Sequence, residues 1–221
     1  MRAFLGNVSH WFDSAIGEND IMNFFDYFQV MALVFFYLIF VGRILQLRQQ
    51  GTNPFVIGLT GKGVRGLLEI SLPFALVVWT IEVITRSLHL RFHVFPNGAY
   101  VDLFGITLLK LLGAVFIITG LIIFVLSLVS FGRSWRIGID KKNPGKLVTT
   151  GIFSMTRNPI FLFLDFYLVG TWLIYPNLFF GIFAVFGITG IHSQILQEEE
   201  FLSKQYGEEY REYAKRVRRY F

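Results

Sequence analysis

Long apolar segments separated by short polar stretches dominate this chain. Three of them, roughly residues 21–45, 67–88 and 103–131, contain few charged residues. A transmembrane helix needs about 20 apolar residues, because each residue rises about 1.5 Å through a hydrocarbon core about 30 Å thick. Each segment is therefore predicted to be one membrane span.

A fourth apolar stretch is too long for a single helix. No residue between Asp165 and Glu198 carries a formal charge, and Pro176-Asn177 interrupts the stretch. A proline followed by asparagine is a turn signal. We predict two short helices, about 159–175 and 178–196, that form a hairpin.

After the hairpin, the pattern changes from continuous to periodic. Apolar and aromatic residues recur every three or four positions from Phe201 to Tyr220, with basic residues between them. This spacing is typical of one face of an amphipathic helix. We expect the part beyond Tyr213 to lie on the membrane surface.

Composition supports a membrane protein. Hydrophobic residues make up 54% of the chain and charged residues 16%, whereas a soluble domain has about 25% charged residues. The predicted fold is an all-α, polytopic membrane bundle of about five transmembrane helices, with a cytoplasmic loop and a C-terminal amphipathic helix. Residues 1–131 would form an N-terminal membrane region, and residues 132–221 the region that carries the chemistry.

The distribution of positive charge predicts the orientation. Lys and Arg gather after the first and third spans and in the tail. The whole chain has a net charge of +5. Cytoplasmic loops carry such an excess. We predict a multi-pass protein of the plasma membrane, or of the inner membrane in a bacterium, with its N-terminus outside and its C-terminus inside. The same placement argues against a nucleic-acid partner, and no cleaved signal peptide is expected at the N-terminus.

Several polar residues lie inside or beside the spans. Glu82 and Lys110 are near the outer ends and are predicted to snorkel. His89 and His93 have the spacing of two metal ligands on a helix, but no third ligand is near, so we predict interfacial histidines and no metal. Asp165 lies about two turns into the fourth span, where it would either make a polar contact in the bundle or line a cavity.

Two polar segments give the strongest indication of chemistry. The first reads GRSWR at 132–136, GKLVTTGIF at 145–153 and RNPIF at 157–161; the second reads EEEFL at 198–202 and YGEEYREY at 206–213. The first brings an arginine and an amide to the start of a helix at Pro159, a position that suits proline. The second places carboxylates where the fifth span leaves the membrane. These charges either mark helix ends or hold a zwitterionic ligand.

The two segments resemble the isoprenylcysteine carboxyl methyltransferases and their relatives among phospholipid N-methyltransferases. That family combines L-V-T-x-G-x-[YF], R-[HN]-P-x-[YF]-x-G, a hydrophobic hairpin, E-E and G-x-x-Y-x-x-Y. The resemblance covers about residues 132–217 and implies a cytoplasm-facing site for S-adenosyl-L-methionine. The residues that it places around this cofactor are Lys146, Leu147, Val148, Phe153, Asn158, Pro159, Phe161 and Glu198.

The resemblance also implies roles in catalysis and acceptor binding. Arg157, Asn158 and Glu199 would be catalytic, and Glu199 or Asp165 would be the base if the acceptor is an amine or a hydroxyl. Gln194 and Asp165 would contact the methyl acceptor, a lipophilic or small molecule. The chain departs from the family pattern where Asn158 replaces the commoner histidine, Phe163 a glycine and Gln194 an arginine.

Two other functions remain open from the sequence. Sterol-reductase-like families share a similar C-terminal Arg-x-Pro segment and would use NADPH, although the carboxylates at 198–200 would repel its phosphates. A non-enzymatic membrane scaffold is the second alternative.

Overall fold

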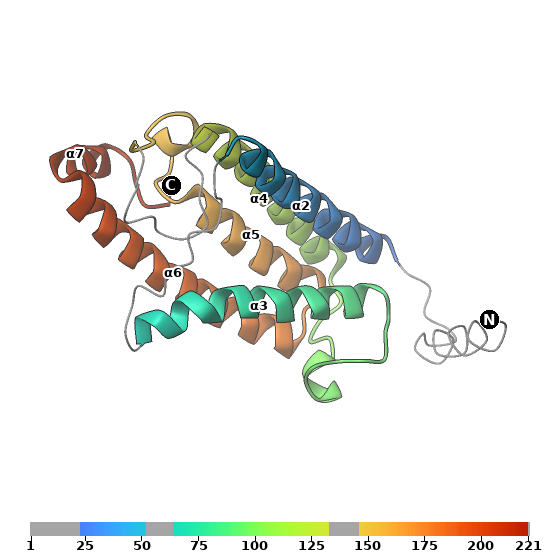
Figure 1. Ribbon diagram of the computed structural model, residues 1–221. Coiled ribbons are helices and arrows are strands. Elements are labelled where there is room, and N and C mark those ends of the chain that lie inside the picture. Colours follow the sequence, from blue (N-terminus) through green and yellow to red (C-terminus); the bar gives the residue numbers. More distant parts are fainter. Residues whose placement is uncertain (1–22, 52–63, 133–145, 221) are drawn as a thin grey trace.

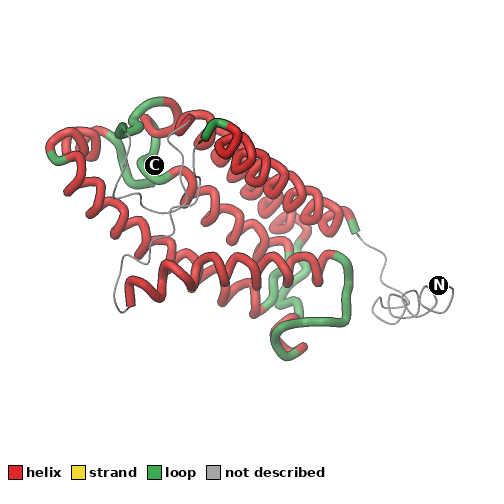
Figure 2. Tube along the Cα trace, viewed as in Figure 1, coloured by secondary structure: helices red, strands yellow, loops and turns green. Residues whose placement is uncertain are grey.

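The computed structural model describes residues 23–51, 64–132 and 146–220, with side chains described from Pro73 onward in the second of these ranges. Helices joined by loops make up this part of the chain, which contains no named strand (Figures 1 and 2). The long helices are α2 (Phe24–Gln49), α3 (Val64–Ser87), α4 (Thr107–Phe131), α5 (Pro159–Ile174) and α6 (Leu178–Tyr206). Shorter ones are η1 (Asn97–Tyr100), η3 (Gly151–Ser154) and α7 (Glu208–Arg216).

All five predicted apolar segments are helical, which confirms an all-α membrane bundle. The helices α2, α4 and α6 are long and apolar enough to cross a membrane. The apolar helix α5 has 16 residues, or about 24 Å at 1.5 Å per residue. It is therefore shorter than a hydrocarbon core of about 30 Å.

Local sequence explains where these helices begin and end. Asn23 caps α2 because its side chain accepts from the backbone N–H of Phe25 and Asp26. In return, the Asp26 side chain accepts from the Asn23 backbone N–H. This reciprocal pair is a capping box. Asn177 caps α6 in a similar way, through Phe180 N–H at 3.0 Å. Gly207 ends α6 at φ +57°, a backbone conformation in which glycine has no steric cost.

Small residues let α4 and α5 approach closely. A methyl group at Gly113 would lie 2.6 Å from the Gly170 carbonyl oxygen, and one at Gly170 would lie 2.7 Å from the Gly113 carbonyl oxygen. Such small-residue contacts allow tight backbone packing between membrane helices. Figure 1 shows α2 beside α4, and α3 crossing α6 on the other side of α5.

Phe163, which replaces a family glycine, belongs to the core. Its ring is 2% exposed and stacks on Phe124 at 4.7 Å, with Phe36 at 5.3 Å. The small residue at this contact is Gly120 of α4. A methyl group there would lie only 3.1 Å from the Phe163 carbonyl oxygen. The close approach is thus kept, with glycine on the opposite helix.

The end of the bundle that carries Pro176, here called the hairpin end, differs from the sequence expectation. Glu82 does not snorkel: it is fully buried, accepts from Val94 N–H at 2.6 Å and lies 3.3 Å from His93. His89 is 2.9 Å from buried Asp26. The two histidines thus pair with separate buried carboxylates, because an unpaired carboxylate in this apolar setting would be costly.

The C-terminal region also differs. The helix α6 continues ten residues past the predicted end, because its polar last turns extend beyond the apolar part. The amphipathic helix is present as α7 but ends at Arg216, and residues 217–220 are not helical. They turn back toward the start of α5 (Figure 1), so the tail beyond Tyr213 does not continue as an interfacial helix.

Candidate functional site

Glu199 joins the two polar segments that the sequence singled out. Its Oε1 accepts from Arg157 Nη2 at 2.9 Å and Nε at 3.2 Å, and from Asn158 Nδ2 at 3.1 Å. Its Oε2 accepts from Arg219 Nη2 at 2.9 Å and Nε at 3.2 Å. We call this end of the bundle the site end. The predicted residues Arg157, Asn158 and Glu199 are therefore in direct contact.

Arg157 uses its remaining donors on the tail. Its Nη1 donates to the carbonyls of Ala214 at 2.9 Å and Val217 at 3.3 Å, and its backbone N–H donates to Arg218 O. The Arg157 and Glu199 side chains are each 12% exposed. The Arg157 guanidinium therefore links the loop before α5 to α6, α7 and the tail. These contacts favour a structural role for Arg157.

The tail and α7 hold the loop that precedes α5. Asn158 Nδ2 and Thr156 Oγ1 both donate to the Arg219 carbonyl, at 3.2 and 3.1 Å. Tyr213 Oη donates to Phe153 O at 2.7 Å, so α7 fixes η3. The last residues of the described chain therefore help to hold the polar loop, together with its contacts to the end of α4.

The site end of α6 has two polar faces. Residues two positions apart on a helix lie about 200° apart, whereas residues four or seven apart share a face. Glu199 and His192 thus share one face, and Glu198 and Gln194 the other. The first face is saturated, since Glu199 pairs with two arginines and His192 Nδ1 is 2.7 Å from Tyr220 Oη.

The second face of α6 carries polar groups that find no partner within the described ranges. Gln194 Oε1 is buried and has no hydrogen-bond partner among the described residues. Glu198 is half-buried, and within the same part of the chain it forms no ion pair. A buried acceptor without a partner costs about 1–3 kcal/mol. The second face thus has polar groups that a ligand could satisfy.

Asp165 lies on the saturated side. Its Oδ1 is buried without a hydrogen-bond partner in the described chain. Burial, and next the charge of Asp165, raise the pKa of the Tyr220 hydroxyl, which bonds to His192. Asp165 is therefore near the His192 face. In the part of the chain that the structure describes, the two predicted acceptor-binding residues, Asp165 and Gln194, form no hydrogen bond with each other.

The predicted cofactor residues surround the start of α5. Lys146 is exposed, and Leu147 and Val148 are half-buried in the non-helical segment before η3. Phe153 is buried against Phe131, with ring centroids 4.5 Å apart. Pro159 is buried at the first position of α5, and Phe161 is half-buried two residues later. The motif residues 133–136 lie outside the described residues.

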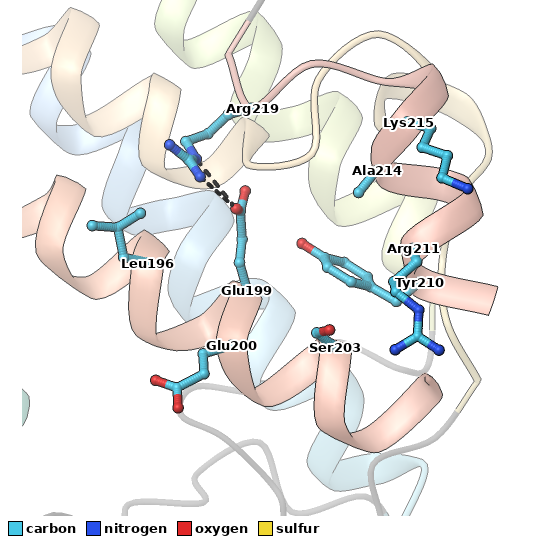
Figure 3. Close-up of a pocket in the computed structure, with 9 residues that line it drawn as sticks. All are labelled: Leu196, Glu199, Glu200, Ser203, Tyr210, Arg211, Ala214, Lys215 and Arg219. Carbon is cyan, nitrogen blue, oxygen red and sulfur yellow. Dashed lines mark hydrogen bonds and ion pairs between the residues drawn. The ribbon is translucent and has the colours of Figure 1, made fainter. Parts of the chain in front are cut away.

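A pocket of about 520 Å³ opens on the Glu199 side (Figure 3). Of the predicted cofactor and catalytic residues, only Glu199 lines it. Its basic residues Arg211, Lys215 and Arg219 pair with Glu208, Glu212 and Glu199. These three cations, which line the pocket, are therefore already ion-paired within the chain rather than left for a phosphate.

Two groups at this pocket keep their ordinary charge at neutral pH. Burial, and next the charge of Glu199, raise the pKa of the Tyr210 hydroxyl to about 12. Its hydrogen bonds to Glu199 raise the pKa of the Arg219 guanidinium above its usual value. Tyr210 thus stays neutral and Arg219 stays charged.

Sequence reasoning missed Arg219, His192 and Tyr220. In the sequence, Arg219 is one of many basic residues in the tail, and no motif marks His192. No periodicity indicates that a tail will fold back onto a loop about 60 residues earlier. The closing G-x-x-Y-x-x-Y pattern did contain Tyr210 and Tyr213, but not their contacts.

Sequence comparison identifies the region that builds this site. Residues 108–209 match the family described as phospholipid methyltransferase. The match begins within α4 and ends in α7, so it includes Arg157, Asn158 and Glu199. This region is similar to the phospholipid methyltransferase family. The resemblance to membrane methyltransferases that the motifs indicated is confirmed.

Curated relatives of this family agree. A protein-S-isoprenylcysteine O-methyltransferase of Xenopus laevis is 27% identical over 121 residues, which cover 53% of this chain and 42% of that protein. Protein-S-isoprenylcysteine O-methyltransferase B of Arabidopsis thaliana is 33% identical over 108 residues, covering 48% and 55%. A probable protein-S-isoprenylcysteine O-methyltransferase of Oryza sativa subsp. indica is 32% identical, covering 48% and 56%. The chain thus aligns with about half the length of these relatives.

Proposed function

We propose that this chain is an integral membrane methyltransferase that uses S-adenosyl-L-methionine and acts on a lipophilic or small acceptor. One observation carries the proposal. The residues that match the methyltransferase family converge at Glu199, beside a face of α6 whose polar groups are left for a ligand. The bound cofactor would supply an activated methyl group on its sulfonium.

The unpaired face of α6 suits this cofactor. Glu198 would accept hydrogen bonds from the cofactor's cationic amino group, an interaction stronger than one between neutral groups. The half-buried Leu147, Val148 and Phe161 would cover the less polar parts of the cofactor, and Lys146 would lie at the open edge. Phe153 and Pro159, both buried, would support that wall.

The Glu199 cluster would position the site rather than react. Both carboxylate oxygens of Glu199 already accept hydrogen bonds from charged or amide donors. A base needs a free lone pair for the proton that it takes. We therefore assign Glu199 and Arg157 to fixing the loop and tail, and Asn158 to linking Glu199 with the tail. Alignment of acceptor and cofactor would be the main contribution, which can reach about 7–11 kcal/mol.

The alternatives predict different ligands. A reductase would bind NADPH, but the cations lining the described pocket are ion-paired within the chain. A scaffold would bind neither cofactor, yet it would leave the buried Gln194 Oε1 unsatisfied.

A titration of purified protein in detergent tests the proposal. We expect saturable binding of S-adenosyl-L-methionine and none of NADPH, measured by calorimetry. Binding of NADPH alone would favour the reductase, and binding of neither would favour the scaffold.

A further inference from the structure

An apolar groove runs along α6 on the same side as Gln194. It encloses about 370 Å³ and is lined by Phe179, Phe183, Gly187 and Gly190 of α6, with Ala75 of α3 and Ala99 of η1. Pockets of this size hold small molecules in many proteins. The groove lies at the hairpin end, away from the pocket on the Glu199 side.

The groove opens toward lipid. Ile182 and Phe186, which also line it, are 47% and 74% exposed although they are large and apolar. Small residues, Ala75, Ala99, Gly187 and Gly190, create the space beneath them. A hydrophobic chain could therefore enter from the membrane without crossing water.

Helical periodicity connects this groove with the unpaired face. Its lining residues on α6 recur at three- and four-residue intervals as far as Gly190. Gln194 and Glu198 follow at the next two four-residue steps, and such positions are neighbours on one helix face. From Leu178 to Gly190 the groove extends along about 18 Å of helix. The buried Gln194 Oε1, which has no hydrogen-bond partner among the described residues, lies just beyond its inner end.

We infer that this groove holds the hydrocarbon chain of the methyl acceptor and that Gln194 receives its head group. The inference rests on the proposed function. The acceptor would have one extended apolar chain, seated between α3 and α6. Its head would donate an N–H or O–H hydrogen bond to Gln194 Oε1, near the methyl group of a cofactor held at Glu198.

The chemistry of Gln194 limits the head group. An amide oxygen accepts hydrogen bonds and carries no positive charge. It satisfies an amine or a hydroxyl, but it cannot neutralise a carboxylate. The groove limits the length of the acceptor's hydrocarbon chain. A hydrocarbon chain longer than the lined segment must leave the groove at the hairpin end.

Photo-crosslinking tests the groove without any turnover. The probe is dodecylamine with a diazirine at the end of its chain, added to the purified protein without cofactor. We expect labelled peptides to map to Phe179, Phe183 or the segment around Ala99. Labelling spread over lipid-facing positions such as Val185, which is 65% exposed on the same helix, would indicate random uptake from the micelle and overturn the inference.

Groove-filling variants test its role in acceptor use. Ala75→Phe and Ala99→Phe each place a ring in the groove, while Val185→Phe adds the same ring outside it. We expect the first two to raise the KM for hexadecylamine about tenfold, which corresponds to about 1.4 kcal/mol, and to leave that for octylamine nearly unchanged. Val185→Phe should change neither.

Cofactor binding separates the two possible failures. If every variant binds S-adenosyl-L-methionine but the filled groove leaves KM unchanged at all chain lengths, the inference is wrong and the proposed function stands. If the wild-type protein does not bind S-adenosyl-L-methionine, the proposed function itself fails. Where a ring at Ala75 prevents folding, Ala99→Phe and the crosslinking map still decide the question.

Discussion

Glu199 and Arg219, twenty residues apart, are joined by two hydrogen bonds to one carboxylate oxygen, at 2.9 and 3.2 Å. The other oxygen of the same carboxylate binds Arg157 and Asn158. One side chain of α6 thus fixes both the loop before α5 and the end of the chain.

Removing the charge of Glu199 should destabilise the protein more than removing Arg219. Glu199→Gln leaves the 12%-exposed Arg157 without its counter-ion, and breaking a largely buried pair costs about 3–5 kcal/mol. Arg219→Gln removes a side chain that is 35% exposed, so solvent screening limits the loss to about 1 kcal/mol. Thermal unfolding in detergent measures both.

Lys215→Gln is the matched control. Its pair with Glu212 is exposed at 2.6 Å, so we expect no measurable change in the unfolding midpoint. Equal losses for Glu199→Gln and Lys215→Gln would show that the Glu199 cluster does not hold the site end together.

This cluster also shows how far sequence reasoning reaches. The runs of apolar residues predicted the five long helices, because burial in lipid imposes that pattern on the chain. The motifs predicted that Arg157 and Glu199 share one site, since each lies at the end of a span. The sequence has no pattern that indicates the fold-back of residues 217–220. This fold-back depends on backbone carbonyls of the tail, which every residue has, and on Arg219, one arginine among many. Glu82 was misplaced for a related reason: its partners, Val94 N–H and His93, follow a loop.

Glu82→Leu should destabilise the hairpin end. It removes the acceptor of the Val94 N–H at 2.6 Å and the partner of His93. Leaving buried polar groups unsatisfied costs about 1–3 kcal/mol. Hydrogen exchange at residues 93–95, compared with that of α5, would measure the local loss. Unchanged exchange would return Glu82 to the role of a snorkelling surface residue.

Glu198→Gln should weaken cofactor binding without affecting stability. A charge-assisted hydrogen bond to the cofactor's amino group is worth about 1.5–3 kcal/mol, which corresponds to roughly a tenfold to hundredfold rise in Kd. Titration of S-adenosyl-L-methionine into both proteins measures it. Glu200→Gln, whose carboxylate pairs with Lys204, serves as the control. Equal affinity in wild type and Glu198→Gln would move the cofactor away from this face.

The orientation can be tested by cysteine labelling, because the chain contains no Cys. The Lys and Arg distribution predicts that the site end faces the cytoplasm. Cysteines introduced singly at the exposed Thr150 and Glu212 should react with an impermeant maleimide only after the membrane is opened. A cysteine at the exposed Gly98 should react in intact cells. The reverse pattern would place the site on the outer side.

Gln194→Arg should change which acceptors are methylated. Gln194 lies where the family resemblance places an arginine, and its neutral amide cannot form the two-pronged, charge-assisted contact that arginine makes with a carboxylate. Wild-type protein should therefore methylate lipophilic amines better than prenylcysteine carboxylates. The variant should reverse this order by raising kcat/KM for carboxylates and lowering it for amines, which its charge would repel.

Transfer of labelled methyl groups to a matched pair, a prenylcysteine analogue and an alkylamine, gives the ratio directly. Leu196→Arg adds the same charge on the opposite face of α6, where Leu196 is exposed, and should leave the ratio unchanged. Strong methylation of the prenylcysteine analogue by the wild-type protein would show that Gln194 does not select the acceptor.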